Sequence, residues 1–381
     1  MGKPRISVKA AGKDRAKDMA LGQLSVGAVV TNHNGGQTVI DCLGALLNAE
    51  HPLSEIIVVD NASSDGSTQR IAEFAPGVTL LQLDENMGPC VARNRGLGAL
   101  ATDLALLLDG DIRLAPDALT LMLEAYGKSG ALTVCPRILL YPETETIQAD
   151  GVAPHFLGTL VLRHGFTSRH QHPRPANSPP FTIVNGAPSA CFLIDRLAAL
   201  DVGGFDELYF FHFEDLEFNM RLGILGYEAV CAERAIAYHD RGLGTPELSY
   251  RGKGDYPVRR FYLSARNRLA TIRIYYRPST LLVLAPPLLA YEFATFLFAV
   301  RKGFLRAWLC AWKWQVENRR PIAERRKTVQ AKRTRSDAEL LVGGPIPLAP
   351  GLVKGGLMKT GVSLMSGLFD ACWRLMRPLL R

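Results

Sequence analysis

Short apolar runs alternate with amphipathic stretches between residues 25 and 111, and this alternation limits the folds that the chain can adopt. The apolar runs lie in SVGAVVTNHN, EIIVVDNASSDGS, VTLLQL and DLALLLDGD. Between them stand QTVIDCLGALLNA, TQRIAEFA and MGPCVARNRGLGAL, which have the pattern of helices. Buried strands joined by crossover helices form a parallel sheet, so the sequence predicts an α/β fold.

Polar loops follow three of the predicted strands, and their sequences are TNHN, DNASSDGS and DGD. In a parallel sheet the carboxyl ends of the strands share one edge, where ligands bind. The third loop contains Asp109 and Asp111, separated by one glycine. Two carboxylates this close repel each other unless a cation or another partner lies between them. Alone, Asp-Gly-Asp is typical of a polar turn, but its place beside the other loops favours a binding site.

The usual phosphate-binding motifs are absent from the sequence. There is no Gly-x-Gly-x-x-Gly after the first predicted strand and no Gly-x-x-x-x-Gly-Lys-Ser/Thr. Their absence argues against a dinucleotide-dependent dehydrogenase and a P-loop NTPase. A phosphate would instead be held through a hard cation such as Mg²⁺, which binds one or two carboxylates together with phosphate oxygens.

The formal net charge of +8 indicates an anionic partner, such as nucleic acid, a phosphate-bearing ligand or a membrane surface. The loops favour the last two, and we expect no nucleic-acid partner. The seven cysteines are scattered and form no Cys-x-x-Cys pair, so a reducing compartment is expected. Residues 1–24 are polar and charged without an apolar core, which predicts a flexible basic arm and no secretory signal.

A second group of acidic residues lies in DVGGFDELYFFHFEDLEFNMRLGILGYEAV, from Asp201 to Val230. A helix is predicted to start near Leu216, with Leu216, Met220 and Ile224 along one face. Glu214 and Asp215 precede it and follow a dense aromatic run. They could cap the helix, or one of them could serve as a catalytic base beside an apolar wall. The segment alone leaves both interpretations equally open.

Two further segments contain histidines. Residues 141–182 include RHGFTSRHQHPRPANSPP, which predicts a long, flexible, irregular loop that could fold over a ligand. His170 and His172 could bind a metal there, but no regular element would hold them in place. His239 follows the strand-like EAVCAERAIAY. It becomes a candidate ligand only if the fold brings it beside Asp111.

Together these motifs resemble family 2 glycosyltransferases with the GT-A fold, particularly the bacterial rhamnosyltransferase-like members. The motifs agree in order and spacing: VVTNHNGG, IIVVDNASSDGS, NMGPCVARNRG, LLLDGD, VGGFDELYFFHFEDLEFNMRLGILGY and HDRGLGT. The likeness covers roughly residues 25–244, with a weaker tail to about residue 341. It implies a Rossmann-like, mostly parallel sheet flanked by helices.

The resemblance implies a nucleotide-sugar site at the predicted rim. Its binding residues would be Thr31, Asn32, Asp60, Asn61, Asp65, Arg93, Asn94 and Asp109. Asp109 and Asp111 match the family's Asp-x-Asp, which binds the ribose and a divalent metal, Mg²⁺ or Mn²⁺. Asp111 and His239 would contact that metal. His33 departs from the family, in which a tyrosine is common at this position.

The implied reaction is an inverting transfer of one sugar from a UDP- or dTDP-linked donor to a hydroxyl of a cell-envelope or lipid-linked glycan. Glu214 and Asp215 match the family's acidic pair, in which the second member is usually the general base. A processive polysaccharide synthase would carry a Gln-x-x-Arg-Trp motif, which the sequence lacks. An inactive, membrane-associated nucleotide-sugar-binding scaffold is the other alternative, but the intact acidic motifs argue against it.

The predicted organisation has four parts: a basic arm over 1–24, a GT-A domain over 25–245, a helical membrane-associated region over 246–340 and an amphipathic tail over 341–381. Residues 281–300 are apolar with one charge, Glu292, and are long enough to span a bilayer. Pro286 and Pro287 interrupt them near the start, and basic residues flank both ends. We therefore expect a peripheral or re-entrant element at the cytoplasmic face of the inner (plasma) membrane.

Overall fold

The computed structural model describes residues 24–175, 177–240, 248, 250, 255–348, 351–352 and 355–380. It contains two compact units. Unit 1 comprises residues 1–152, 162–215 and 227–242, and unit 2 comprises residues 153–161, 216–226 and 243–381. The arm predicted over 1–24 lies outside the described residues except for Leu24, which is buried. The domain boundary predicted after residue 245 also lies outside them.

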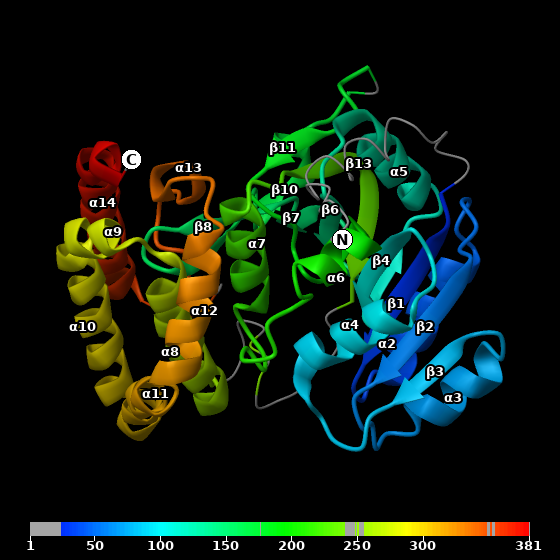
Figure 1. Cartoon of the computed structure of the whole chain (residues 1–381), viewed down its shortest axis with the longest axis horizontal. Coiled ribbons are helices and arrows are strands. Elements are labelled where there is room, and N and C mark those ends of the chain that lie inside the picture. Colours follow the sequence, from blue (N-terminus) through cyan, green and yellow to red (C-terminus); the bar gives the residue numbers. More distant parts are fainter. Residues whose placement is uncertain are drawn as a thin grey trace, which may run out of the picture. The chain divides into compact units, whose positions relative to one another are not determined.

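The alternating segments of unit 1 form a parallel β-α arrangement, as the sequence predicts. They are β1 (Val26–Asn32), α2 (Gly36–Leu47), β2 (Glu55–Asp60), α3 (Ser67–Phe74), β3 (Thr79–Gln82), α4 (Gly88–Ala99) and β4 (Leu104–Asp109). Their strands lie in the order β4-β1-β2-β3 and are all parallel (Figure 1). The register pairs Thr31 with Asp109 and Asn32 with Asp60, which aligns the three polar loops along one edge.

The remaining strands of unit 1 make the sheet mixed, so the predicted parallel pairing holds for β1 to β4 and for one further strand pair. The further elements are β5 (Ile112–Leu114), α5 (Ala118–Ser129), β6 (Thr133–Leu140), β12 (Cys191–Asp195), α6 (Arg196–Asp201) and β13 (Ala229–His239). Strand β12 is antiparallel to both β4 and β6, whereas β13 is parallel to β6 and antiparallel to β5. Apolar runs indicate burial but not direction, which explains the difference.

The irregular loop predicted for residues 163–180 is confirmed over most of that stretch, although the wider segment 141–182 contains several short strands. The segment contains β7 (Thr146–Ala149), β8 (Val152–His155), β9 (Thr159–Leu162), β10 (Thr167–Ser168), the 3-10 turn η2 (Arg169–Gln171) and β11 (Thr182–Val184). Its basic residues neutralise a buried acid. The carboxylate of Asp150 is fully buried and lies within 3.3 Å of Arg137, Arg163 and His164. These contacts between basic side chains and the buried Asp150 therefore anchor the segment.

The two histidines of that segment do not form a metal site. His170 Nε2 lies 2.6 Å from a carboxylate oxygen of Glu145, and the ring of His172 stacks on that of His164 with centroids 3.6 Å apart. Arg174, two residues further on, pairs with the buried Glu233 at 2.9 Å. These contacts tie the segment to β13, so the mobility predicted for it is not supported.

Unit 2 is mainly helical. Its helices after residue 255 are α8 (Val258–Tyr275), α9 (Pro278–Val283), α10 (Ala285–Lys302), α11 (Leu305–Glu317), α12 (Arg319–Ala331), α13 (Asp337–Leu340) and α14 (Gly356–Met376), followed by η3 (Arg377–Leu380). The apolar run 281–300 is divided between α9 and α10, with prolines at the start of α10. Among the described residues, no helix is both long enough and apolar enough to cross a membrane.

Helix α8 is the centre of unit 2, and α12 closes its carboxyl end. The last carbonyl groups of a helix have no partner within the helix. Arg326 donates to the carbonyls of Arg273 and Tyr276 at 2.6 and 2.8 Å, and Gln330 donates to that of Tyr275 at 2.9 Å. These side chains satisfy groups that would otherwise be buried without hydrogen bonds, which fixes α12 on α8.

Candidate active site

The loops after β1 and β2 are joined by a buried polar network. Asn32 donates from its amide nitrogen to Asp60 at 2.6 Å, to Ser63 at 3.1 Å and to Ser67 at 3.0 Å. Asp60 also accepts from the backbone and hydroxyl of Ser63 at 2.9 and 2.6 Å. Asn32 and Asp60 are almost fully buried, so they define the shape of the loops. Ser63 and Ser67 were not singled out from the sequence, although DNASSDGS is rich in residues that bond to nearby backbone.

Two more predicted residues hold neighbouring loops together. Asn61 accepts from the backbone of Met87 at 3.0 Å, and its carbonyl lies 2.8 Å from Nδ1 of His33. The Nδ1 atom of His33 is therefore the donor, because a carbonyl oxygen can only accept. Asp65 accepts from the backbone of Gly36 and Ser67 at 2.8 and 3.0 Å. Burial opposes ionisation, but these hydrogen bonds prevail and lower the pKa of Asp65.

The Asp109-Gly110-Asp111 turn lies against the end of β1. The backbone N–H of Gly110 donates to the carbonyl of Thr31 at 2.9 Å, and the hydroxyl of Thr31 donates to Asp109 at 3.3 Å. A Cβ atom at position 110 would lie 2.8 Å from the Thr31 carbonyl oxygen. Since such an approach is too close for a carbon atom, only glycine fits between the two aspartates.

His239 lies beside Asp111, which is the arrangement that makes it a candidate ligand. Strand β13 pairs with β5 so that His239 is opposite Ile112, the residue after Asp111. His239 Nε2 is 3.1 Å from Asp111 Oδ1, and the backbone of Asp240 donates to the Asp111 carbonyl at 2.8 Å. The histidine is largely buried, whereas the Asp111 carboxylate is about a quarter exposed. The partly exposed Asp111 carboxylate can therefore contact a ligand while His239 and the backbone of Asp240 hold Asp111 in place.

Arg93 connects the two acidic motifs. This arginine lies on α4 and is 1% exposed. Its Nη2 atom donates to Asp109 at 2.6 Å, its Nη1 atom lies 3.5 Å from Glu214, and its guanidinium covers the ring of Phe205. Burial opposes the charge, but Asp109 and Glu214 raise the pKa of Arg93 above its ordinary value. An arginine on a buried helix face requires such acidic partners. The position of Arg93 in the predicted helix MGPCVARNRGLGAL could therefore have indicated them from the sequence.

The loop before α7 (Glu214–Ile224) is fixed by α4. Asn94 accepts from the backbone of Phe205 at 2.8 Å and donates to its carbonyl at 2.9 Å and to Glu207 at 3.0 Å. A Cβ atom at Gly204 would lie 2.3 Å from the Asn94 oxygen. The side chain of Asn94 thus orients this loop, and the nucleotide contact inferred for it stays a prediction.

Two strained residues precede the second acidic pair. His212 and Phe213 have φ angles of 71° and 68°, and their rings stack with centroids 4.7 Å apart. Residues other than glycine rarely adopt this region, at a cost of about 1–3 kcal/mol each. Strained backbone of this kind collects at functional sites, and here it directs the chain into α7 (Glu214–Ile224). The helix begins two residues before the predicted Leu216, whose side chain is buried as expected.

Glu214 and Asp215 differ in their surroundings. Glu214 is 7% exposed and faces Arg93, whereas Asp215 is half-buried. A general base must come within hydrogen-bond distance of the acceptor hydroxyl. The more accessible Asp215 suits that role better than Glu214. Both lie in the first turn of α7, where the helix dipole stabilises a carboxylate, so capping and catalysis are compatible.

Asp111 and His239 fit a hard divalent cation rather than zinc. Among the described residues, no group of three or more His, Cys, Asp or Glu side chains is placed to hold a metal. Zinc sites in proteins use three or four protein ligands. Mg²⁺ and similar ions bind one or two carboxylates and complete their shell with phosphate oxygens and water. Asp111 and His239, with Oδ1 and Nε2 3.1 Å apart, match the small number of protein ligands in a site of the Mg²⁺ kind.

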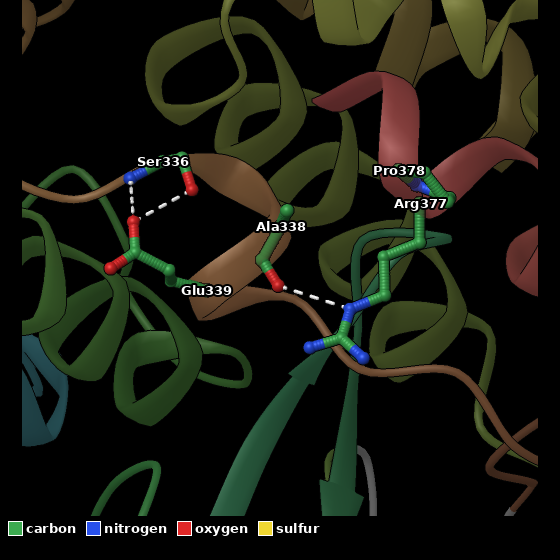
Figure 2. Close-up of a pocket in the computed structure, with 5 residues that line it drawn as sticks. All are labelled: Ser336, Ala338, Glu339, Arg377 and Pro378. Atoms are coloured by element: carbon green, nitrogen blue, oxygen red, sulfur yellow. Dashed lines mark hydrogen bonds between the residues drawn. The ribbon is translucent and has the colours of Figure 1, made fainter. Parts of the chain in front are cut away.

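A cavity of about 630 Å³ lies in unit 2 and includes none of the predicted site residues. It is lined by Ser336, Ala338, Glu339, Arg377 and Pro378. Figure 2 shows that Glu339 accepts from the backbone and hydroxyl of Ser336, and that Arg377 donates to the carbonyl of Ala338. These hydrogen bonds cap α13, so the polar residues that line the cavity have a structural role.

Known proteins share both the sequence pattern and the fold. A family model described as Glycosyl transferase family 2 matches residues 28–191. The N-acetylglucosaminyl-diphospho-decaprenol L-rhamnosyltransferase of Mycobacterium tuberculosis is 28% identical over 220 residues, which cover 52% of this chain and 70% of that protein.

Two solved structures are similar in fold. The structure of GalNAc-T7 with UDP, GalNAc and Mn²⁺ has a TM-score of 0.55 at 12% identity, covering 78% of this chain and 58% of that one. Residues 1–349 of S. aureus TarS with UDP-GlcNAc give a TM-score of 0.50 at 17% identity, covering 76% and 79%. At these identities the likeness shows the fold alone. Residues 28–191 therefore match glycosyl transferase family 2, and the described residues have a GT-A-like fold with a mixed sheet.

Proposed function

We propose that this protein transfers one sugar from a nucleotide-diphosphate sugar to an acceptor hydroxyl, with inversion at the anomeric carbon. The observation that carries the proposal is Arg93, which lies within 3.5 Å of an acid from each motif, Asp109 and Glu214. This shared contact supports the proposal that the predicted donor-binding turn and the predicted catalytic pair act in one site. The M. tuberculosis relative is named as a rhamnosyltransferase, which supports sugar transfer, and a UDP- or dTDP-linked donor is part of the proposal.

In this proposal the loops after β1 and β2 bind the nucleoside. Thr31 and Asn32 line the pocket, Asp60 and Asn61 shape the side towards the base and ribose, and Asp65 closes the loop. The buried network between Asn32 and Asp60 fixes these loops before the ligand arrives. A preformed pocket reduces the entropy that ordering on binding would cost.

The chemical step uses one carboxylate. Asp215 accepts the proton of the acceptor hydroxyl while that oxygen attacks the anomeric carbon. The bond from this carbon to the diphosphate oxygen breaks, and the diphosphate leaves with the electron pair on the opposite face. Asp111 and His239 would hold Mg²⁺ or Mn²⁺, which would neutralise charge on the leaving diphosphate. Arg93 holds Asp109 and Glu214 in place.

The proposed acceptor is a hydroxyl of a cell-envelope or lipid-linked glycan, and the proposed location is the cytoplasmic face of the plasma membrane. The name of the M. tuberculosis relative specifies a decaprenyl diphosphate acceptor, which supports a lipid-linked substrate. Nucleotide-sugars are made in the cytosol, so a donor site on that side is required.

A donor panel tests the proposal. The purified chain is mixed with UDP-, dTDP- and GDP-sugars and a polyprenyl-diphosphate-linked sugar, and release of nucleoside diphosphate is measured with Mn²⁺. We expect release with one donor class, and proton NMR of the product should show the opposite anomeric configuration. Retention of configuration, or no release from any donor that calorimetry shows to bind, would contradict the proposal.

A further inference from the structure

We propose that unit 2 binds flat on an anionic lipid bilayer through exposed apolar faces of α10, α11 and α14. This inference does not depend on the proposed transfer reaction. It selects the in-plane arrangement from the peripheral and re-entrant arrangements that the sequence leaves open. Most of the exposed large apolar side chains among the described residues lie on these helices and the segments beside them.

Helix α10 carries the clearest apolar face. Leu289, Phe293, Leu297 and Val300 are 50–69% exposed. Their spacing of four, four and three residues places them on one side of a helix. The other side packs on unit 2, where the ring of Phe298 lies 5.8 Å from that of Phe261. The helix is therefore held along its length with its apolar stripe outward.

Helices α11 and α14 continue the pattern. Exposed apolar residues follow helical spacing on both: Leu305, Leu309, Trp312 and Val316 on α11, and Leu364, Leu368 and Leu375 on α14. The opposite side of α14 is buried, with Trp373 stacked on Phe156 at 5.1 Å and Phe369 lying 6.4 Å from Tyr291 of α10. In Figure 1, α9, α10 and α14 form one edge of unit 2. Each helix thus has a protein side and an uncovered side.

The only acid of α10 does not oppose contact with lipid, because it is neutralised within the protein. Glu292 pairs with Arg268 at 2.7 Å and accepts from the indole nitrogens of Trp308 and Trp312 at 2.8 and 3.1 Å. Because their N–H groups are hydrogen-bonded to Glu292, the two indoles present apolar surface beside a polar carboxylate. Tryptophan has this amphipathic character at membrane interfaces.

The charge of the same region selects the partner. Residues 285–331 carry the acids Glu292, Glu317 and Glu324, and their exposed basic residues are Arg301, Lys302, Arg306, Lys313, Arg319, Arg320 and Lys327. Anionic headgroups attract such a surface. A second copy of the chain would bring the same positive charge against it, so self-association is disfavoured. A bilayer satisfies both the apolar stripe and the basic residues.

Vesicle sedimentation of the full chain tests this inference. Vesicles of phosphatidylcholine alone and of phosphatidylcholine with phosphatidylglycerol are compared. We expect wild-type protein to bind the anionic vesicles and the double variant Leu289→Glu/Leu297→Glu to lose at least about tenfold in affinity per side chain. The matched control is Leu197→Glu/Leu200→Glu on α6 of unit 1, where both leucines are also exposed, and it should bind like wild type.

A charge variant tests the lipid headgroup. Arg301→Gln/Arg306→Gln should weaken binding to anionic vesicles about fivefold per lost charge and leave binding to neutral vesicles unchanged. Circular dichroism checks that each variant folds, and Leu289→Ser/Leu297→Ser replaces the glutamate pair if that pair does not fold.

Three outcomes would overturn the inference: wild-type protein that stays in solution with both vesicle types, apolar variants that bind as tightly as wild type, or light scattering that shows a wild-type dimer lost in Leu289→Glu/Leu297→Glu. None of these depends on a sugar donor, so failure here is separate from failure of the transfer reaction.

Discussion

Two buried arginines, Arg93 of unit 1 and Arg333 of unit 2, show how differently the two units use charge. Arg93 reaches two acids of the candidate site, and these acids raise its pKa against the effect of burial. Arg333 pairs with the fully buried Asp337 at 2.8 Å and donates to the carbonyl of Arg335 at 3.0 Å. Burial lowers the pKa of Arg333, although Asp337 acts in the opposite direction.

The difference lies in what surrounds each charge. Unit 1 gathers carboxylates at the ends of strands, where Asp109 and Asp111 stay partly exposed. Unit 2 uses its buried charges to complete helix ends and to hold helices together, as Arg326 does at α8. We conclude that buried charge in unit 1 is arranged for a ligand, whereas buried charge in unit 2 serves stability.

The largest effect that we expect is on catalysis in unit 1. Asp215→Asn keeps the shape of the side chain but cannot accept a proton at neutral pH, so kcat should fall by about 10²–10⁴-fold. Nucleotide affinity, measured by calorimetry, should stay near that of wild type. Asp201→Asn, an exposed acid on α6, is the control. If Glu214→Gln loses kcat and Asp215→Asn does not, the base is Glu214.

The arginines themselves test the comparison directly. Arg93→Met leaves Asp109 and Glu214 without their shared cation, and should lower the free energy of unfolding by about 3–5 kcal/mol. Arg93→Lys keeps a positive charge but not the planar group that contacts both acids. We therefore expect a clear loss of kcat with a smaller loss of unfolding free energy than in Arg93→Met. Arg333→Lys should lower the melting temperature and leave kcat unchanged. Equal loss of kcat in both lysine variants would remove the distinction between the units.

The metal site that we propose for unit 1 should be detectable in donor binding. Asp111→Ala should weaken nucleotide-sugar affinity at least about tenfold, since a lost contact to a charged group costs roughly 1.5–3 kcal/mol. It should also abolish the increase in affinity that Mn²⁺ gives to wild type, and His239→Ala should act in the same direction with a smaller effect. Full wild-type transfer in excess EDTA would contradict a metal at this position.

The smallest effect concerns the pH dependence of unit 2. His155 is fully buried, its Nε2 lies 3.3 Å from the carbonyl of Gly344, and its Nδ1 accepts from the backbone of Leu157. Burial is the main cause that lowers the pKa of His155 to about 4, from 6.5. The folded state therefore disfavours protonation, and stability present above pH 6.5 is lost as the pH falls towards 4.

Between pH 7 and pH 5 this loss amounts to about 2 kcal/mol of unfolding free energy. His155→Gln keeps a donor and an acceptor but does not titrate, so its denaturant midpoint should fall less over that range. Urea titrations of wild type and variant at both pH values measure the difference. Identical pH slopes would show that His155 does not control this behaviour.

Sequence alone identified the parallel strands β1 to β4, their helices and the three polar loops at their ends. These features are local: a short apolar run sets a strand, an amphipathic run sets a helix, and Asn, Asp, Ser and Gly set the turns between them. The loop order then places Asp60 and Asp109 at one edge whatever the rest of the chain does. The same locality explains why the acidic pair could be found from its segment, whereas the choice of Asp215 as the base rested on the family resemblance.

Only the tertiary structure decided which distant residues meet. Strand β12 enters antiparallel between β4 and β6, and β13 returns beside β5, so His239 reaches Asp111. Arg93 likewise meets Glu214 only after α4 packs against the loop before α7. Strand direction and partner choice depend on contacts between residues far apart in sequence, and no local pattern records them. For that reason the segment RHGFTSRHQHPRPANSPP was expected to be a flexible loop, whereas its residues Arg163 and His164 contact the buried Asp150.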